Sequence, residues 1–226
     1  MKLVPGDVIS DCIAFTGIWE LQLSRRLVRL RRCHDDNQTM IDIGANLGYF
    51  SLLWAAAPGN TCFSFEPSPR NAELFRHNVT SNGLGSQIKV FPLAAGKEAG
   101  SRGFNAGAVD QTGWGGFSAG DSSPDIFVEV VRIDEVLAGL KEIALLKIDT
   151  EGADTWALMG CERLLRSRSV RLVWFEQNKP RMRRLGIGDG EAEAFLRSVG
   201  YKARPESDPS RDVVDWSASP MSRGQS

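Results

Sequence analysis

The sequence predicts a single α/β domain with a doubly wound, mainly parallel sheet of the Rossmann-like kind. Three observations predict this fold. From residue 39 onward, short apolar runs alternate with segments whose apolar residues recur at helical spacing, which is typical of strands alternating with helices. A glycine-containing turn directly follows the first apolar run. The chain of 226 residues, 42% hydrophobic and 24% charged, fits one mid-sized domain over 1–226.

The short apolar runs give the expected strands. Those of the parallel sheet are 40–43, 61–65, 88–91, 143–148 and 170–175, and edge strands are expected at 201–204 and 213–216. Apolar residues at helical spacing predict helices over 50–57, 69–79, 157–165 and 192–199. Ser68 is expected to cap the second of these helices and Asp189 the fourth.

Three segments lie outside the alternation. Residues 1–38 are expected to form an N-terminal helical arm, and residues 206–226 a C-terminal edge or tail. The glycine-rich stretch 96–125 interrupts the order between the third and fourth strands. With Trp114 and Phe117 it forms either a mobile lid over an apolar acceptor or a disordered surface insertion, and the sequence leaves both open.

Composition excludes several classes of protein. The 27 basic and 28 acidic residues give a net charge of −1, unlike the strongly basic domains that bind nucleic acid. Four cysteines without a C-x-x-C pair and only two histidines argue against a zinc site. The N-terminal residues do not predict a signal peptide, and no apolar stretch is long enough to predict a membrane span. We expect a cytoplasmic protein with no metal and with no nucleic-acid or membrane partner. A divalent metal bound by Asp149 and Glu151 stays open as an alternative, and so does the oligomeric state, a homodimer included.

The first chemical motif follows the first strand and reads Asp42-Ile43-Gly44-Ala45-Asn46-Leu47-Gly48. Its glycines let the backbone turn sharply and approach a ligand closely. A pyrophosphate-binding loop requires G-x-G-x-x-G, but Asn46 stands where the second glycine would be, and the charge of Asp42 would repel phosphate. An acid beside the turn instead suits the ammonium and sulfonium of S-adenosylmethionine. A structural turn without a ligand is the alternative.

Two further motifs lie at the ends of later strands. Glu66 follows the second strand, 22 positions after Gly44, where a carboxylate can accept hydrogen bonds from both ribose hydroxyls. The fourth strand ends in Lys147-Ile148-Asp149-Thr150-Glu151-Gly152. Its carboxyl end is expected beside the first strand, which places Asp149 near the reactive sulfur of the cofactor. Lys147 and Asp149 point to the same side and can pair, so a purely structural ion pair stays possible.

Together these motifs resemble the FkbM family of S-adenosylmethionine-dependent methyltransferases. The resemblance covers about residues 10 to 205. It also includes Gly17-Ile18-Trp19-Glu20, Val131-Arg132-Ile133-Asp134 and Glu176. It implies a class I methyltransferase fold and methylation of a hydroxyl oxygen on a small natural product or sugar. The glycine-rich stretch 96–125 and the tail after Pro205 depart from the family pattern.

The motifs and the resemblance give a set of expected site residues. The catalytic candidates are Asp149 and Glu151, which could remove the proton of a hydroxyl acceptor, and Lys147, which could tune Asp149 or stabilise a developing alkoxide. The expected cofactor-binding residues are Asp42, Gly44, Ala45, Asn46, Gly48, Tyr49, Glu66, Pro67 and Glu20. The expected residues for a small-molecule acceptor are Asp134, Trp114, Phe117 and Glu176. Neither His34 nor His77 is placed to act as a base. Two alternatives remain, a catalytically silent nucleoside-binding module and a nicotinamide-dependent oxidoreductase on a similar fold.

Overall fold

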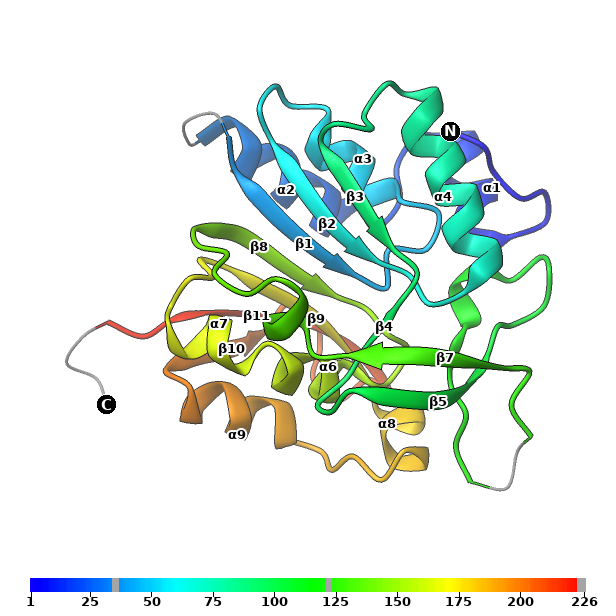
Figure 1. Ribbon diagram of the computed structural model, residues 1–226. Coiled ribbons are helices and arrows are strands. Elements are labelled where there is room, and N and C mark those ends of the chain that lie inside the picture. Colours follow the sequence, from blue (N-terminus) through cyan, green and yellow to red (C-terminus); the bar gives the residue numbers. More distant parts are fainter. Residues whose placement is uncertain (34–36, 121–122, 223–226) are drawn as a thin grey trace.

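A seven-stranded sheet forms the centre of the protein, in a computed structural model that describes residues 1–33, 37–120 and 123–222 (Figure 1). The strand order is β10-β11-β9-β8-β1-β2-β3. The neighbours from β3 to β9 pair in parallel, whereas β11 is antiparallel to both β9 and β10. The predicted α/β class with a mainly parallel sheet is confirmed. The strands are β1 (Thr39–Ile43), β2 (Thr61–Phe65), β3 (Ile88–Phe91), β8 (Ile143–Ile148), β9 (Val173–Asn178), β10 (Tyr201–Pro205) and β11 (Val213–Pro220).

Helices cover both faces of this sheet, so it is doubly wound. Side chains of α2, α3 and α4, among them Trp54 and Phe75, form one buried cluster. Side chains of α6, α7 and α9, among them Leu158 and Leu196, form another on the opposite face. The helices of this sheet are α2 (Leu21–Cys33), α3 (Tyr49–Ala55), α4 (Pro69–Ser81), α5 (Ile133–Val136), α6 (Asp154–Gly160), α7 (Glu162–Arg166), α8 (Lys179–Arg184) and α9 (Glu191–Ser198). In the described part of the chain, no helix has the length and apolar character needed to cross a bilayer.

The strand register brings the three motifs together. Ile43 at the end of β1 is level with Phe65 of β2 and with Ile148 of β8. The residues that follow these strands therefore lie at one edge of the sheet, where the strand order reverses on either side of β1. Open α/β sheets bind their ligands in the crevice at this point.

The N-terminal residues form the expected helical arm. Asp7 caps α1 (Val8–Thr16) by accepting a hydrogen bond of 2.9 Å from the backbone N–H of Ser10, and Gly17 ends the helix in the left-handed conformation. On α2, Leu23 and Leu27 are buried in the core cluster that also contains α3.

Three local predictions were wrong. The segment 157–165 holds two helices, α6 and α7, that meet at Cys161. The residue before α9 is Gly190 in the left-handed conformation, whereas Asp189 pairs with Arg183 at 2.8 Å. β9 begins three residues later than expected and continues to Asn178, because Val170 forms only an isolated bridge.

The C-terminal segment is also more than an edge or tail. β11 lies between β9 and β10, with Val214 and Ala218 buried. This strand is therefore an interior part of the sheet, and of the two C-terminal strands only β10 lies at an edge.

The described part of the glycine-rich stretch is not a disordered insertion, which was one of the two alternatives that the sequence left open. Its strands form a second sheet in the order β4-β7-β5-β6, and Figure 1 shows β5 and β7 side by side beyond the main sheet. Phe104, Val128 and Val130 are buried in a small core of its own. The elements are β4 (Ala94–Ala95), β5 (Gly100–Asn105), the short 3-10 helix η1 (Thr112–Trp114), β6 (Gly116–Phe117) and β7 (Ile126–Val131).

Candidate active site

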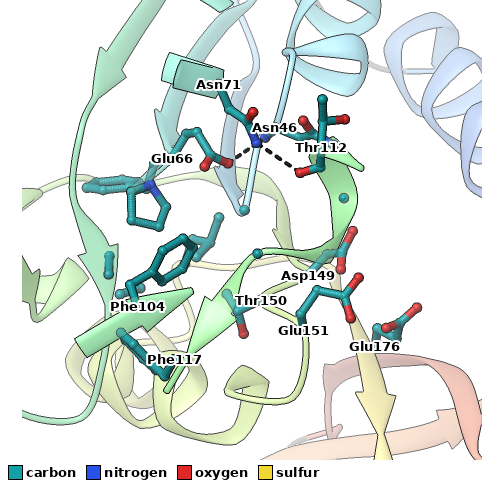
Figure 2. Close-up of a pocket in the computed structure, with 18 of the residues that line it drawn as sticks. Asn46, Glu66, Asn71, Phe104, Thr112, Phe117, Asp149, Thr150, Glu151 and Glu176 are labelled. Carbon is teal, nitrogen blue, oxygen red and sulfur yellow. Dashed lines mark hydrogen bonds between the residues drawn. The ribbon is translucent and has the colours of Figure 1, made fainter. Parts of the chain in front are cut away.

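A cavity lies beyond the carboxyl ends of β1, β2 and β8 and is covered by the second sheet (Figure 2). Gly44, Asn46, Glu66 and Pro67 line one part of it, together with 93–95. Figure 2 shows three carboxylates gathered in another part, those of Asp149, Glu151 and Glu176. Trp19 and Glu20 from the N-terminal arm and Thr112, Phe104 and Phe117 from the second sheet also line the cavity.

The glycine turn after β1 passes very close to the end of β8. Gly44 has φ +75°, and a Cβ built on it would lie 1.7 Å from the carbonyl oxygen of Asp149. Only glycine avoids both the steric overlap and the cost of the left-handed conformation. Gly48 is required for packing. A Cβ built on it would lie 2.1 Å from ring carbons of Phe75, so only glycine leaves room for that ring. Gly48 does not line the cavity, so its place in the structure gives no support for the predicted cofactor contact.

Glu66 is held rigidly in the cavity wall. One carboxylate oxygen accepts the N–H of Asn46 at 2.8 Å and the other accepts the N–H of Ser68 at 2.9 Å. The side chain is buried, and this burial raises the pKa of Glu66 to about 7 despite the two hydrogen bonds. Because each oxygen of a carboxylate has two lone pairs, each can accept one more donor from a ligand.

Lys147 is buried beside the cavity and contacts both the glycine turn and the acid that follows β8. Its Nζ donates to the carbonyl oxygen of Gly44 at 3.0 Å and lies 3.3 Å from Asp149 and 3.5 Å from Asp42. Burial alone would lower the pKa of Lys147, but Asp149 and Asp42 outweigh burial and hold that pKa above its ordinary value. Lys147 is thus a charged cross-link between the turn and β8. It does not line the cavity.

Asp42 does not line the cavity either, contrary to its predicted contact with the cofactor. Its carboxylate is fully buried and accepts a hydrogen bond from Ser51 at 2.5 Å. The acid that the sequence placed beside the ligand instead balances the charge of Lys147.

The three gathered carboxylates differ in their partners. Glu151 lies 3.5 Å from Arg181 and accepts a hydrogen bond of 3.2 Å from Asn178. Burial and the charge of Asp149 raise the pKa of Glu151 to about 7 and that of Glu176 to about 10. One oxygen from each of the three lies within 4.8 Å of the others, a spacing that a divalent cation could bridge. An acidic cluster alone assigns no ion.

Four other predicted site residues lie away from this cavity. Trp114 is 61% exposed, with its ring 5.9 Å from the guanidinium of Arg181, while its neighbours Gly113 and Gly115 line the cavity. Asp134 is buried between Arg132 and the backbone N–H of Arg163. Ala45 and Tyr49 line a smaller neighbouring hollow, which Lys147 and Asp149 also line. His77 is exposed on α4, and His34 lies outside the described residues.

Sequence spacing missed several residues of the cavity. Asn71 on α4 lines it and donates to the carbonyl oxygen of Thr112 at 2.9 Å. The backbone N–H and hydroxyl of Thr112 in turn donate to Asp7 at 2.8 and 3.0 Å. These contacts join segments up to 105 residues apart, and no local pattern in the sequence indicates them.

The turn and the neighbouring carboxylate fit S-adenosylmethionine. Glu66 has free lone pairs for the two ribose hydroxyls. In the described part of the chain, the Oδ1 atom of Asn46 is buried without a hydrogen-bond partner, and a donor from a ligand would satisfy it. The close approach at Gly44 keeps the backbone in the cavity wall free of side-chain bulk. Gly44, Asn46 and Glu66 are thus the residues that would hold the cofactor.

The chain is similar to known methyltransferases. The 31-O-demethyl-FK506 methyltransferase FkbM of Streptomyces tacrolimicus is 26% identical over 243 residues, covering 87% of this chain and 88% of that protein. The fold is similar to that of the precorrin-6y C5,15-methyltransferase of Geobacter metallireducens, with a TM-score of 0.53 and 13% identity over 92% of each chain. It is also similar to a Streptococcus mutans protein in complex with SAH, with a TM-score of 0.56 and 7% identity over 90% of this chain and 100% of that one. At these identities the two solved structures establish the fold alone.

A family profile matches most of the chain. The profile of the methyltransferase FkbM domain matches residues 42–203. The matched range contains the glycine turn, Glu66 and the acids that follow β8. FkbM methyltransferases use S-adenosylmethionine, the cofactor that the turn predicted. The chain therefore belongs to the FkbM family of methyltransferases.

Proposed function

We propose that this protein transfers a methyl group from S-adenosylmethionine to a hydroxyl oxygen of a small natural product or sugar. One observation carries the proposal: a single cavity joins the cofactor-binding residues Gly44 and Glu66 to the carboxylates of Asp149 and Glu151. A methyl donor bound at one part would thus face an acceptor bound at the other. The Streptomyces tacrolimicus relative is named as a methyltransferase of 31-O-demethyl-FK506, a compound whose name records a missing O-methyl group, and this supports an oxygen acceptor.

The residues have distinct roles in this proposal. Glu66 and Asn46 hold the nucleoside part of the cofactor. Asp149 and Glu151 border the acceptor and orient its hydroxyl, and Lys147 keeps Asp149 in place through their 3.3 Å ion pair. Phe117 gives the acceptor an apolar surface. Positioning of this kind supplies roughly 7–11 kcal/mol of catalysis when the reacting atoms are well aligned.

The test has two stages. Calorimetric titration with S-adenosylhomocysteine is expected to show binding that Glu66→Gln weakens, while Glu129→Gln on the exposed face of β7 leaves it unchanged. Transfer of labelled methyl from S-adenosylmethionine is then measured on 31-O-demethyl-FK506 and on a panel of hydroxylated macrolides and sugars. Binding without transfer to any hydroxyl would favour the silent nucleoside-binding module instead. Full turnover by Asp149→Asn with unchanged cofactor affinity would remove Asp149 from the acceptor site.

A nicotinamide-dependent oxidoreductase has less support. Membership of the FkbM family and the lack of a second glycine at Asn46 both disfavour it. The same calorimeter would detect NAD binding directly.

A further inference from the structure

Glu20 occupies an unusual place at the edge of the cavity. It lies between α1 and α2, and its carbonyl oxygen accepts the backbone N–H of Ser24 at 2.9 Å in the first turn of α2. Its φ of +42° is in the left-handed region, which disfavours residues that have a Cβ. Strained backbone of this kind persists where the surrounding structure holds a side chain in a required place. Here that place is the cavity wall, beside Trp19.

Four of the carboxylates that line the cavity, those of Glu20, Asp149, Glu151 and Glu176, fall into two groups. Asp149 is paired with Lys147, and Glu151 is paired with Arg181 and bonded by Asn178. Among the residues that the structure describes, neither Glu20 nor Glu176 has a cation within ion-pair distance. A nearby cation stabilises the ionised form of a carboxylate and makes it a weaker base, whereas burial without a cation has the opposite effect.

The surroundings of Glu20 set its basicity. Burial and the neighbouring charge of Asp149 raise the pKa of Glu20 to about 8, Asp215 adds repulsion, and Lys147 and a hydrogen bond from Trp19 oppose the rise. A positive sulfonium in the same cavity would lower this pKa toward neutrality, where a general base is most effective. Glu176, whose pKa is raised to about 10, holds its proton too tightly for that task.

We propose that Glu20 is the catalytic base, which accepts the proton of the acceptor hydroxyl as the methyl group is transferred. The inference rests on the proposed function. It differs from the expectations that Asp149 or Glu151 removes this proton and that Glu20 binds the cofactor. The cofactor supplies the methyl group, so the acceptor oxygen forms a bond to the methyl carbon while the sulfur–carbon bond breaks and its electron pair stays on sulfur. The carboxylate of Glu20 takes the released proton and later gives it to solvent. Asp149 and Glu151, fixed by their cations, orient the hydroxyl.

The first test needs no acceptor. Calorimetry in buffers of different ionisation enthalpy measures the protons released when S-adenosylmethionine or S-adenosylhomocysteine binds at pH 7.5. The wild-type protein is expected to release more protons with S-adenosylmethionine, because only that compound has the sulfonium charge. Glu20→Gln is expected to abolish the difference while binding S-adenosylhomocysteine within about threefold of wild type. A difference that persists in Glu20→Gln, or that disappears only in Glu176→Gln, would overturn the proposal.

The second test uses the hydroxyl acceptor found in the labelled-methyl assay. The kcat/KM of the wild type for the acceptor, measured with the cofactor bound, is expected to rise with pH as Glu20 ionises near neutrality. Glu20→Gln should lower kcat by about 10²–10⁴-fold and flatten that rise, Glu20→Asp should recover part of the rate, and Glu129→Gln should match the wild type. An unchanged pH profile in Glu20→Gln, or loss of cofactor affinity as its main defect, contradicts the base role. If wild type binds the cofactor but methylates no hydroxyl, the proposed function fails, and the proton-release result still decides whether Glu20 senses the sulfonium.

Discussion

Substitution of Gly44 by alanine tests whether the close approach of the turn to β8 is essential. Gly44 has φ +75°, and its added Cβ would lie 1.7 Å from the carbonyl oxygen of Asp149. Gly83→Ala is a matched control, because Gly83 has φ +67° and no heavy atom within 4 Å of the same position. The two substitutions share the cost of the left-handed conformation and differ in the steric overlap.

The expected magnitudes follow from these two contributions. The left-handed conformation alone costs about 1–2 kcal/mol, which is the full effect expected for Gly83→Ala. Displacement of the β8 exit by the new methyl group adds about 1–3 kcal/mol, as in overpacked cores. Gly44→Ala should therefore lower the free energy of unfolding by about 2–5 kcal/mol, and the melting temperature falls by about 2–4 °C for each kcal/mol in a chain of this size.

Urea unfolding and calorimetric titration with S-adenosylhomocysteine measure the outcome. Gly44→Ala should also weaken cofactor binding at least tenfold, because the displaced carbonyl of Gly44 is the one that Lys147 holds at 3.0 Å. Gly83→Ala should bind like the wild type. The reasoning is refuted if both variants lose the same stability and both keep full affinity.

Three further predictions concern buried charges and the cover of the cavity. Lys147→Met should cost about 3–5 kcal/mol in urea unfolding, because it leaves buried carboxylates without their cation, whereas the exposed Lys202→Met should change stability little. Asp7→Ala removes the acceptor of both Thr112 hydrogen bonds; we expect faster proteolysis within 100–117, and an unchanged cleavage rate would contradict this. Burial raises the pKa of Asp154 from 3.8 to about 7. The stability that protonation of Asp154 contributes is therefore fully present below about pH 4 and is lost as pH rises through 7. This contribution is about 4 kcal/mol. Asp154→Asn should therefore gain stability over wild type at pH 8 but not at pH 4, and equal unfolding midpoints at pH 8 would contradict the assignment.

The sequence predicted the central sheet and the meeting of its three motifs. Strand and helix patterns depend on residues close together in the sequence, so they can be recognised without the tertiary structure. The observed bounds agree with the expected ones to within one residue for β1, β2, β3 and β8. The position of Asp149 beside Gly44 followed from the rule that parallel strands end at one edge of the sheet. The pairing of Lys147 with Asp149 followed from alternation along one strand.

The errors lie where distant segments decide the structure. Glycine content left a disordered insertion open for 96–125, yet β5 pairs with β7 through a register that no local pattern specifies. Trp114 was expected in the cavity, but at η1 the chain places Gly113 and Gly115 in the cavity wall and leaves Trp114 outside it. Asp42 was expected to contact the cofactor, and it contacts Lys147, which lies on another strand.

By itself, the sequence determined the α/β class, the glycine turn after the first strand and the acids at the end of the fourth parallel strand, because turn geometry and strand alternation are properties of neighbouring residues. Only the tertiary structure decided which of those acids are paired, which residues line the cavity and how the second sheet covers it. The hydrogen bond from Lys147 to Gly44 joins residues 103 positions apart. Ionisation and basicity depend on burial and on charges brought within a few ångströms by folding, so the distinction between the paired Asp149 and the unpaired Glu20 exists only in the folded protein.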